Sequence, residues 1–551
     1  MFSVLQKFLF IFFISFTVVL FAQNSTKEKD YIITYTTTDA QIVFDIPVSV
    51  KAFDVFTKNS IPIDPIIGQP NVFVLKHIHP AQIIQLQYYY LYGANYDLQT
   101  SFFASPSLST GTIDVFFNHP VDITFAQTQN AINLSNTLDN KLISYINACS
   151  TTLDIAIYNS YSPSSTSSIA GAINSAYYRG VQVRVIYDGS TSSSMIPLLN
   201  NGIPKVSSPT SVEYGIMHNK FVVFDANVTD VNKPLVWTGS TNWTTSQIDG
   251  PDRNNAIVIQ DQALALGYTI EFNEMWGSST MVPNTTLSKF GPYKTDNTPH
   301  QYIIGGKTID SYFSPSDGVT AKIVAAINSA NSDIDIATML ITRSDIRYAV
   351  LNKYNSGFTN INVLVDSQIP TGNQFYTIQS GIMPNHAVQY ATSSIMHHKF
   401  MVVDNFNSSS DPLVVLGSHN WSSAAETKND ENTLIVHNAN IANQYYQAFA
   451  YLYQQSGGII TLPLATETIE QTTNSIVMYP NPTNGMLHFQ SKENYTNFDL
   501  KVQNLLGKTI VTQHLESLTS STLDLSRETA GIYFITLSSP TKSWRYKVIK
   551  N

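Results

Sequence analysis

The chain has 551 residues with 30 basic and 39 acidic side chains, a formal net charge of −9, and 43% of its residues are hydrophobic. This composition excludes an intrinsically disordered chain and a collagen-like repeat. The length favours roughly three or four domains. The acidic balance argues against strong nonspecific binding to nucleic acid. The single cysteine, Cys149, can form neither an intrachain disulfide nor a cysteine-based zinc site.

Residues 1–22 form an apolar leader with one basic residue, Lys7, ahead of an apolar run that continues to Ala22. The run is of borderline length for a membrane span, so a membrane anchor is the alternative interpretation. A short basic flank followed by an apolar stretch is typical of a secretory signal peptide. We therefore expect residues 1–22 to be a signal peptide that is cleaved after Ala22.

Residues 23–112 are rich in β-branched and aromatic residues and are punctuated by proline and glycine, which predicts a β-rich domain. The region contains no catalytic motif, and its role stays open. A tyrosine cluster in it could be a binding platform for glycans or lipid headgroups, but a half-buried strand is the simpler interpretation. The cluster consists of Tyr88, Tyr89, Tyr90 and Tyr92.

The middle of the chain carries an internal duplication. The segment IDVFF at 113–117 recurs as IDSYF at 309–313, and similar helix and strand patterns follow each copy. In the first copy Gly180 is placed to end a helix before a buried strand. The alternation of strands and helices predicts two α/β halves with largely buried parallel strands, which we place at 113–290 and 305–458.

After the duplication, a linker rich in Thr and Glu, residues 459–477, leads to a last segment at 478–551. Short alternating or apolar stretches bounded by turn residues predict a small β-sandwich there. Through YPNP, NG, N-x-x-G-K, LDLS, GIYF and the terminal KVIKN, the segment resembles the C-terminal sorting domain of the type IX secretion system of Bacteroidetes-type bacteria. The resemblance implies export across two membranes by that machinery, followed by release or attachment at the cell surface.

A polar motif interrupts the apolar strands once in each half. MHNKFVVFD at 217–225 and MHHKFMVVD at 396–404 are identical at six of nine positions, and WTGSTNW at 237–243 corresponds to VLGSHNW at 415–421. Because alternate residues of a strand share a face, each half brings an imidazole, a lysine, a serine and an amide together. These residues are His218, Lys220, Ser240 and Asn242 in the first half and His397, Lys399, Ser418 and Asn420 in the second.

Taken singly, each of these residues has a purely structural explanation. The same set at matched spacing in both halves favours a functional site, because burying charge without a purpose is costly. The set suits a phosphodiester: lysines and asparagines donate to it from two sides, one histidine attacks phosphorus, and the other protonates the departing oxygen. Near these strands the sequence has no HxH pair, HExxH motif or carboxylate cluster, so we expect no metal ion and no cofactor.

The motif H-x-K-x-x-x-x-D followed by G-S-x-N resembles the signature of the phospholipase D superfamily, and both copies lie within about 113–458. The resemblance implies an α/β fold of two similar sandwich lobes that form a pseudo-dimer, one active site between them, a covalent phosphohistidine and no metal requirement. The family usually has an acidic residue shortly after the Asn. Glu431 fills this place in the second half, whereas Asn254 stands there in the first. Asp225 and Asp404 lie at an odd offset from the lysines, on the opposite strand face, which favours a structural role.

In the family, the acidic residue is expected to reach across the interface to the histidine of the opposite half. This makes His218 the nucleophile and His397 the general acid, although the reverse stays open because a carboxylate also raises the pKa of an acid. We expect the catalytic residues to be His218, Lys220, Asn242, His397, Lys399, Asn420 and Glu431. We expect the substrate-binding residues to be Ser240, Ser418 and Asn254.

The motif indicates the chemistry but not the substrate, because family members act on phospholipids, cardiolipin and nucleic acids with one kind of site. Export and the acidic chain favour phospholipid. Hydrolysis of DNA or RNA is the runner-up, with a basic groove built from Arg179, Arg184 and Arg253, and a noncatalytic surface binding protein is a further alternative that the intact motifs count against. We expect a secreted or surface-located monomer with an internal pseudo-dimer, whose partners are its phosphodiester substrate and the type IX machinery.

Overall fold

The computed structural model describes residues 25–27, 30–36, 38–91, 97–160, 163–460, 476–491, 496–504, 508–517, 520–538 and 543–551. The expected signal peptide, Tyr92 and most of the expected linker lie outside these residues. The chain divides into two compact units, Met1–Thr461 and Leu462–Asn551, and each is described by itself. Among the described residues, no helix is long and apolar enough to cross a membrane.

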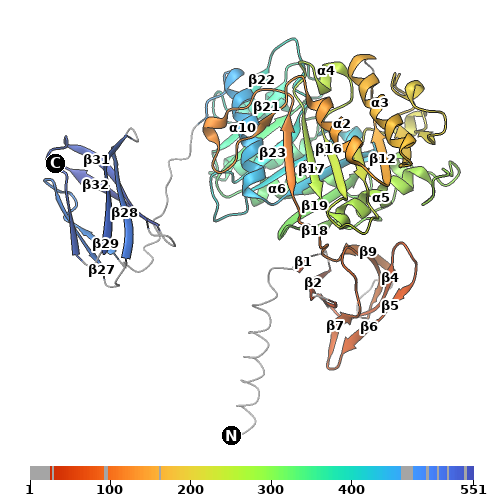
Figure 1. The fold of residues 1–551 in the computed structure, drawn as a ribbon, viewed down its shortest axis with the longest axis horizontal. Coiled ribbons are helices and arrows are strands. Elements are labelled where there is room, and N and C mark those ends of the chain that lie inside the picture. The colour runs from red at the N-terminus through yellow and green to blue at the C-terminus, as the bar shows by residue number, and fades with distance from the viewer. Residues whose placement is uncertain are drawn as a thin grey trace, which may run out of the picture. The chain divides into compact units, whose positions relative to one another are not determined.

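The N-terminal part of the first unit is a β-sandwich (Figure 1). Its strands are β1 (Ser25–Lys27), β2 (Tyr31–Tyr35), β3 (Ala40–Phe44), β4 (Val48–Asp54), β5 (Ser60–Ile61), β6 (Ile63–Ile66), β7 (Gln69–Leu75), β8 (Ile83–Tyr90) and β9 (Gln99–Ala104). One sheet has the order β1-β2-β3-β7-β6 and the other β5-β4-β8-β9. On β8, Tyr88 is buried and Tyr89 is exposed, so this part of the tyrosine cluster is a half-buried strand, as the simpler interpretation predicts.

The duplication folds into two eight-stranded sheets, which with their helices we call lobe 1 and lobe 2 (Figure 1). Lobe 1 contains β10 (Ile113–Phe117), β11 (Ile132–Asn133), β12 (Thr152–Ile157), β13 (Gln182–Tyr187), β14 (Lys205–Ser207), β15 (Lys220–Phe224), β16 (Leu235–Gly239) and β17 (Asn255–Gln260). Lobe 2 contains β18 (Gln301–Ile304), β19 (Lys307–Ser314), β20 (Ile334–Thr338), β21 (Ile361–Asp366), β22 (Ala387–Tyr390), β23 (Lys399–Val403), β24 (Leu413–Gly417) and β25 (Glu431–Val436). The orders β11-β10-β17-β16-β15-β12-β13-β14 and β18-β19-β25-β24-β23-β20-β21-β22 correspond from their second strand onward. The predicted α/β fold of two similar lobes is confirmed.

Helices cover both sheets. The α-helices are α2 (Leu138–Ala148), α3 (Pro163–Tyr178), α4 (Thr245–Ile248), α5 (Gln262–Trp276), α6 (Val319–Ser329), α7 (Ser344–Asn355), α8 (Phe375–Gly381), α9 (Ser423–Thr427) and α10 (Ala439–Gln455). The 3-10 helices are η1 (Ile123–Phe125), η2 (Ile196–Leu198), η3 (Val212–Tyr214) and η4 (Gly291–Tyr293). Gly180, with a φ of +91°, follows the end of α3 as predicted.

The central strands are largely buried as expected, but the expectation that they are parallel is correct for only part of each sheet. The strands β12, β13 and β14, and their counterparts β20, β21 and β22, form parallel sets, and β10 pairs parallel with the short β11, whereas β15, β16 and β17 pair antiparallel. A parallel pair needs a crossover connection, which α3 supplies between β12 and β13. The chain from β15 to β17 contains only the short α4, so these strands pair as neighbours with alternating directions.

The two lobes share one hydrophobic core. Helix α5 of lobe 1 places Tyr268 against Phe313 of lobe 2, with ring centroids 5.0 Å apart. Helix α10 of lobe 2 places Tyr445 against Phe117 of lobe 1, at 5.2 Å. Each long helix therefore lies between its own sheet and the opposite lobe, and the burial of these aromatic rings fixes how the two sheets face each other.

The second unit is the predicted small β-sandwich. Its strands are β26 (Ile476–Tyr479), β27 (Met486–Ser491), β28 (Thr496–Asn504), β29 (Thr509–Ser517), β30 (Ser520–Asp524), β31 (Gly531–Ser538) and β32 (Ser543–Lys550). They form a sheet of order β26-β27-β30 and another of order β29-β28-β31-β32. Leu487, Leu500, Val502, Ile535 and Leu537 are buried in its core.

Candidate active site

The histidine and lysine of each motif lie at the start of a strand. Lys220 is the first residue of β15 and Lys399 is the first residue of β23, so the histidines come two residues before the strands rather than on them. Lys220 Nζ donates to the carbonyl oxygen of His218 at 2.7 Å, and Lys399 Nζ to that of His397 at 2.6 Å. All four side chains are buried, and the two copies have the same local geometry.

Each histidine is held by a backbone bridge from the opposite lobe. The N–H of His218 donates to the carbonyl oxygen of Asp430 at 2.9 Å, just before β25 of lobe 2. The N–H of His397 donates to the carbonyl oxygen of Arg253 at 2.9 Å, just before β17 of lobe 1. The residue that follows each bridge is thereby set beside the histidine of the other lobe.

Glu431 and Asn254 are these following residues. Glu431 Oε2 lies 2.7 Å from His218 Nδ1, so the carboxylate reaches across the interface as the family resemblance implies. Asn254 Oδ1 lies 2.9 Å from His397 Nδ1. The amide nitrogen of Asn254 faces the carbonyl oxygens of Gln247 and Asp252 at 3.2 and 3.3 Å, which orients its oxygen toward the imidazole. Both histidines therefore carry a hydrogen on Nδ1, and each neutral ring offers a lone pair on Nε2.

The site favours the neutral forms of its bases. Burial lowers the pKa of His218 and of His397 well below the usual value, and the charges on Lys220 and Lys399 lower it further. Burial also lowers the pKa of Lys220 to about 7, while burial and then Lys220 lower the pKa of Lys399 well below its usual range. Burial raises the pKa of Glu431. An entering anion would reverse this balance, because negative charge raises the pKa of both lysines.

The motif serines hold the residues that orient the histidines. Ser240 Oγ donates to Asn254 Oδ1 at 3.0 Å and accepts from the N–H of Asn255 at 3.1 Å. Ser418 Oγ accepts from the N–H of Asn432 at 3.1 Å and hydrogen-bonds Glu431, which lowers the pKa of that carboxyl. Both hydroxyls are thus engaged within the protein.

The two motif asparagines each have a side-chain oxygen without a hydrogen-bond partner among the groups that the structure describes. Within the described residues, Asn242 Oδ1 and Asn420 Oδ1 are buried without a hydrogen-bond partner. The amide nitrogen of Asn242 donates to Gln247 Oε1 at 2.7 Å, which fixes that side chain. Because amide groups that lack a partner in a buried site are costly, we interpret Asn242 and Asn420 as groups that await a ligand.

Asp225 and Asp404 have the structural role that their offset predicts. Asp225 accepts from the backbone N–H groups of Thr151 and Thr152 at 2.6 and 3.1 Å, at the start of β12. Asp404 accepts from the N–H of Ser332 at 2.7 Å, at the corresponding turn before β20. Both carboxylates therefore anchor the loop before a central strand.

Sequence reasoning missed the role of a second pair of aspartates. Asp188 Oδ2 accepts from the N–H of Met217 at 2.8 Å, and Asp366 Oδ2 accepts from the N–H of Met396 at 2.6 Å. Each therefore fixes the residue directly before a motif histidine. The signal was present, because each aspartate ends or directly follows an apolar strand in its half.

Two more side chains at the site belong to one half only, and duplication therefore gave no signal for them. The ring of Tyr158 lies 4.7 Å from that of His218, centroid to centroid. His419, inside the second G-S-x-N copy, is buried, and its Nδ1 lies 2.7 Å from Ser314 Oγ. Threonine stands at the matching place in the first copy.

The three arginines named as a basic groove do not gather at the site. Arg184 forms a two-pronged ion pair with Asp154, with both N–O distances at 2.7 Å. Arg179 donates to backbone carbonyl oxygens, among them that of Ile146 at 3.0 Å. Only Arg253 adjoins the site, through its backbone bridge to His397. The groove of these three residues is therefore not formed.

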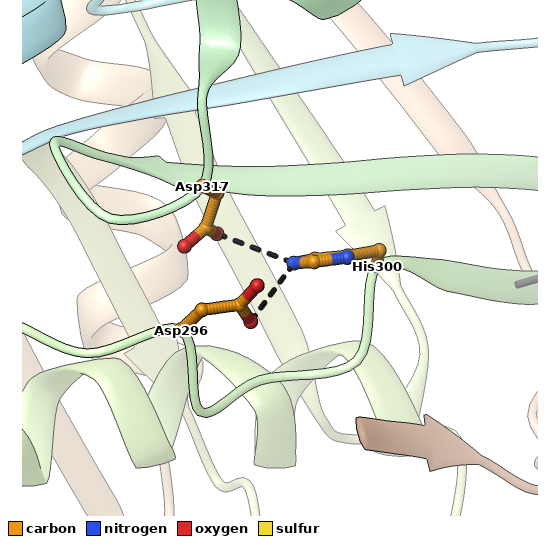
Figure 2. Close-up of side chains that lie close together, drawn as sticks. All are labelled: Asp296, His300 and Asp317. Carbon is orange, nitrogen blue, oxygen red and sulfur yellow. Dashed lines mark ion pairs between the residues drawn. The ribbon is translucent and has the colours of Figure 1, made fainter. Parts of the chain in front are cut away.

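A separate histidine cluster lies in lobe 2 (Figure 2). His300 Nε2 lies 3.1 Å from Asp296 Oδ1 and 3.6 Å from Asp317 Oδ2, and within the described residues this is the group with metal-ligand spacing. Burial lowers the pKa of His300, but the two carboxylates outweigh burial and raise the pKa to about 10. In this protonated form, His300 is an ion-pair anchor that joins the loop before β18 to the turn after β19.

Comparison with known proteins agrees with the duplication. A family described as cardiolipin synthase, PLD-like domain, matches residues 142–276 and 323–453. A family described as secretion system C-terminal sorting domain matches residues 477–551, which indicates type IX secretion and hence a secreted or surface location. The mitochondrial cardiolipin hydrolase of Xenopus tropicalis is 34% identical over 113 residues, which are 20% of this chain and 49% of that protein. That of Canis lupus familiaris is 28% identical over 177 residues, 31% of this chain and 63% of that protein.

The chain thus spans about half of the length of the first of these relatives, 49%, and 63% of the second. Among solved structures, the phospholipase D family member Nuc from Salmonella typhimurium is 21% identical with a TM-score of 0.23, covering 30% of this chain and 94% of that one. Phosphatidylserine synthase from Haemophilus influenzae is 12% identical with a TM-score of 0.43, covering 62% of this chain and 86% of that one.

Proposed function

The duplicated region of this chain belongs to the phospholipase D superfamily, and from this premise we propose that the protein hydrolyses phosphodiesters through a covalent phosphohistidine. One observation carries the proposal. Two buried histidines, each with Nδ1 held from the opposite lobe, meet two buried lysines at a single interface. This arrangement provides a nucleophile, a general acid and a cationic cradle for one phosphate anion.

In the first step, His218 Nε2 attacks phosphorus and the bond from phosphorus to the leaving oxygen breaks. His397 enters this step as an imidazolium, a form that the negative charge of the bound diester favours, and gives its Nε2 proton to that oxygen, so that the leaving group departs as a neutral alcohol. Glu431 stabilises the imidazolium that forms at His218, as a carboxylate does beside a histidine that becomes cationic. Lys220 and Lys399 neutralise the nonbridging phosphate oxygens.

In the second step, His397 acts as a base and takes a proton from water, which attacks phosphorus as the bond to His218 Nε2 breaks. The products are a phosphomonoester and the free imidazole, so the enzyme returns to its starting state. The amide nitrogens of Asn242 and Asn420 donate to the phosphate oxygens in both steps, that of Asn242 through the hydrogen that its bond to Gln247 leaves free. Ser240, Ser418 and Asn254, which the sequence predicted to bind substrate, have their hydrogen bonds within the protein, and we propose that they instead orient the two histidines.

We propose phospholipid as the substrate class, with cardiolipin as the first lipid to test. Two curated relatives are named cardiolipin hydrolases, and the sorting domain directs this chain outside the cell, where bilayers of other cells and vesicles are accessible. The net charge of −9 and the internal use of Arg179 and Arg184 speak against a polynucleotide groove. A nuclease of the same superfamily remains the second candidate.

The test is an activity panel on the purified chain without its leader. The substrates are vesicles of cardiolipin or of phosphatidylcholine, linear and single-stranded DNA, and bis(p-nitrophenyl) phosphate as a generic diester. We expect turnover of the generic diester and of lipid, with activity retained in excess EDTA. The matched control is a His218→Ala, His397→Ala double variant, whose remaining activity measures any contaminating enzyme.

Each result of the panel has a defined meaning. Turnover of DNA with inert lipid would replace the phospholipid assignment by the nuclease. Loss of activity in EDTA that Mg²⁺, Ca²⁺ or Zn²⁺ restores would contradict the metal-independent mechanism. Wild-type protein that is inert on every diester would favour a noncatalytic binding protein.

A further inference from the structure

Tyr158 touches both catalytic groups of lobe 1. It follows β12, which pairs with β15 so that Ile157 stands opposite Lys220. Its ring lies 4.7 Å from the His218 ring at an interplanar angle of 62°, and Lys220 Nζ lies 5.1 Å from its centroid. Its side chain is only half-buried.

Lobe 2 has no aromatic ring at the corresponding place. The N–H of Tyr158 donates to the carbonyl oxygen of Asn219 at 3.0 Å, and the N–H of Met339 donates to that of His398 at 2.8 Å. Asn219 and His398 are matching residues of the two motifs, so Met339 is the counterpart of Tyr158. Within the described residues, no ring contact or cation–π contact is found for His397 or Lys399 comparable to those of Tyr158.

A ring in this position favours positive charge. The face of a phenol ring attracts a cation, and the attraction grows when the cation is removed from water, as Lys220 is here. Other charged or titratable groups also face Lys220. The carboxylates of Glu431 and Asp188 raise its pKa, and Lys220 in turn lowers the pKa of the second lysine, Lys399.

We propose that Tyr158 is a positioning residue that stabilises the cationic forms of Lys220 and His218, and thereby makes His218 the histidine that carries the phosphoryl group. The inference rests on the proposed function and deepens it. Tyr158 would be the second group, after Glu431, that stabilises positive charge on the His218 imidazole. The ring also limits rotation of His218, whose Nδ1 is already held by Glu431, so that Nε2 stays directed toward phosphorus.

A graded series at position 158 tests the inference. Tyr158→Phe keeps the ring and loses the hydroxyl, Tyr158→Trp enlarges the ring, and Tyr158→Met copies the residue of lobe 2. We expect kcat on bis(p-nitrophenyl) phosphate to stay within about twofold for Phe and to fall by about fivefold to thirtyfold for Met, the range that a desolvated cation–π contact supports. Met339→Leu is the matched control in lobe 2 and should leave kcat unchanged.

The pH profile separates positioning from a structural effect. Without the ring, Lys220 loses its proton at lower pH, so the alkaline limb of kcat/KM should move down by about one pH unit in Tyr158→Met. The alkaline limb should stay at the same pH in Tyr158→Phe and move to higher pH in Tyr158→Trp. Melting temperatures of all four variants identify any loss of folding. If Tyr158→Met is unstable, the pH profiles of Tyr158→Phe and Tyr158→Trp still test the inference.

The outcomes distinguish the inference from the function on which it rests. If Phe is as slow as Met, the hydroxyl rather than the ring matters and the inference is wrong. If the alkaline limb does not move across the series while wild-type enzyme turns over, the inference also fails and the function stands. If wild-type enzyme forms no phosphoryl adduct and turns over no diester, the inference fails together with the function.

Discussion

Lobe 1 and lobe 2 have the same strand order from the second strand of each sheet onward and the same His, Lys, Ser and Asn set, but they surround their histidines differently. His218 contacts a carboxylate, Glu431, and an aromatic ring, Tyr158. His397 contacts the neutral amide of Asn254. The backbone bridges that hold both histidines are equivalent, so the difference lies in side chains alone.

This difference teaches how a symmetric scaffold can run an asymmetric reaction. A nucleophilic histidine becomes a cation and needs a compensating charge that stays in place. A histidine that first gives and then takes a proton needs a neutral partner that does not trap it in one protonation state. The fold supplies two equal positions, and one residue at each, Glu431 or Asn254, separates their roles.

Replacing either histidine should have the largest effect. We expect His218→Ala and His397→Ala each to lower turnover of bis(p-nitrophenyl) phosphate by about three orders of magnitude or more, with nearly unchanged melting temperature. The double variant should be no slower than the slower single variant, because the two residues act in one reaction. His79→Ala, at an exposed position of the N-terminal sandwich, is the control. A single variant with a tenth of wild-type turnover would rule out one shared site.

Replacing the side chains that hold the two histidines should have the next largest effect on turnover. Glu431→Gln leaves an isosteric amide on His218 that cannot stabilise an imidazolium, and we expect kcat to fall by about two to three orders of magnitude. Asn254→Asp places a carboxylate beside His397 as well, and should lower kcat much less. Steady-state kinetics of both variants measure the contrast. A larger loss for Asn254→Asp than for Glu431→Gln would reverse the assignment of the two lobes.

Changing the leaving group should distinguish the roles of the two histidines through a smaller difference in turnover. Because p-nitrophenolate hardly needs protonation, His397→Ala should be at least about tenfold less damaging on bis(p-nitrophenyl) phosphate than on an alkyl diester, whereas His218→Ala should be equally damaging on both. Rapid-quench mass spectrometry of wild-type enzyme should find the phosphoryl group on the peptide that contains His218. An adduct on the peptide that contains His397 would invert the mechanism.

The pH dependence should show which lysine limits the reaction. Burial lowers the pKa of Lys220 to about 7, so the cation is lost as the pH rises and kcat/KM should fall by about tenfold per unit above that value. Lys220→Arg keeps a charge that does not titrate there and should move the alkaline limb to higher pH. The measurement is kcat/KM at intervals from pH 5 to pH 10. A profile for wild-type enzyme without an alkaline limb would show that Lys220 keeps its proton throughout.

The repeated part of the site could be predicted from the sequence because chemistry requires the same residue types in both halves. His218 and His397 stand in nearly identical segments, and an apolar strand with two polar interruptions has few structural explanations. The structural role of Asp225 and Asp404 followed from strand alternation alone. The α/β fold followed from the order of helix and strand patterns.

The parts that differ between the halves could not be predicted. Tyr158 stands in an ordinary apolar strand pattern, and only the packed structure shows that its ring meets His218. The direction of β15, β16 and β17 depends on loops that turn the chain without a crossover helix, and buried strands of either direction look alike in sequence. The orientation of the Asn254 amide depends on two carbonyl oxygens, those of Gln247 and Asp252, that no motif contains.

The crossed backbone bridges also bear on how such a site can diverge. In a dimer of identical single-lobe chains, every substitution appears twice, so a carboxylate gained or lost beside one histidine is gained or lost beside both. In one continuous chain, a change at position 254 reaches only His397 and a change at position 431 reaches only His218. Covalent fusion of the two copies is therefore what allows selection to act on each imidazole separately.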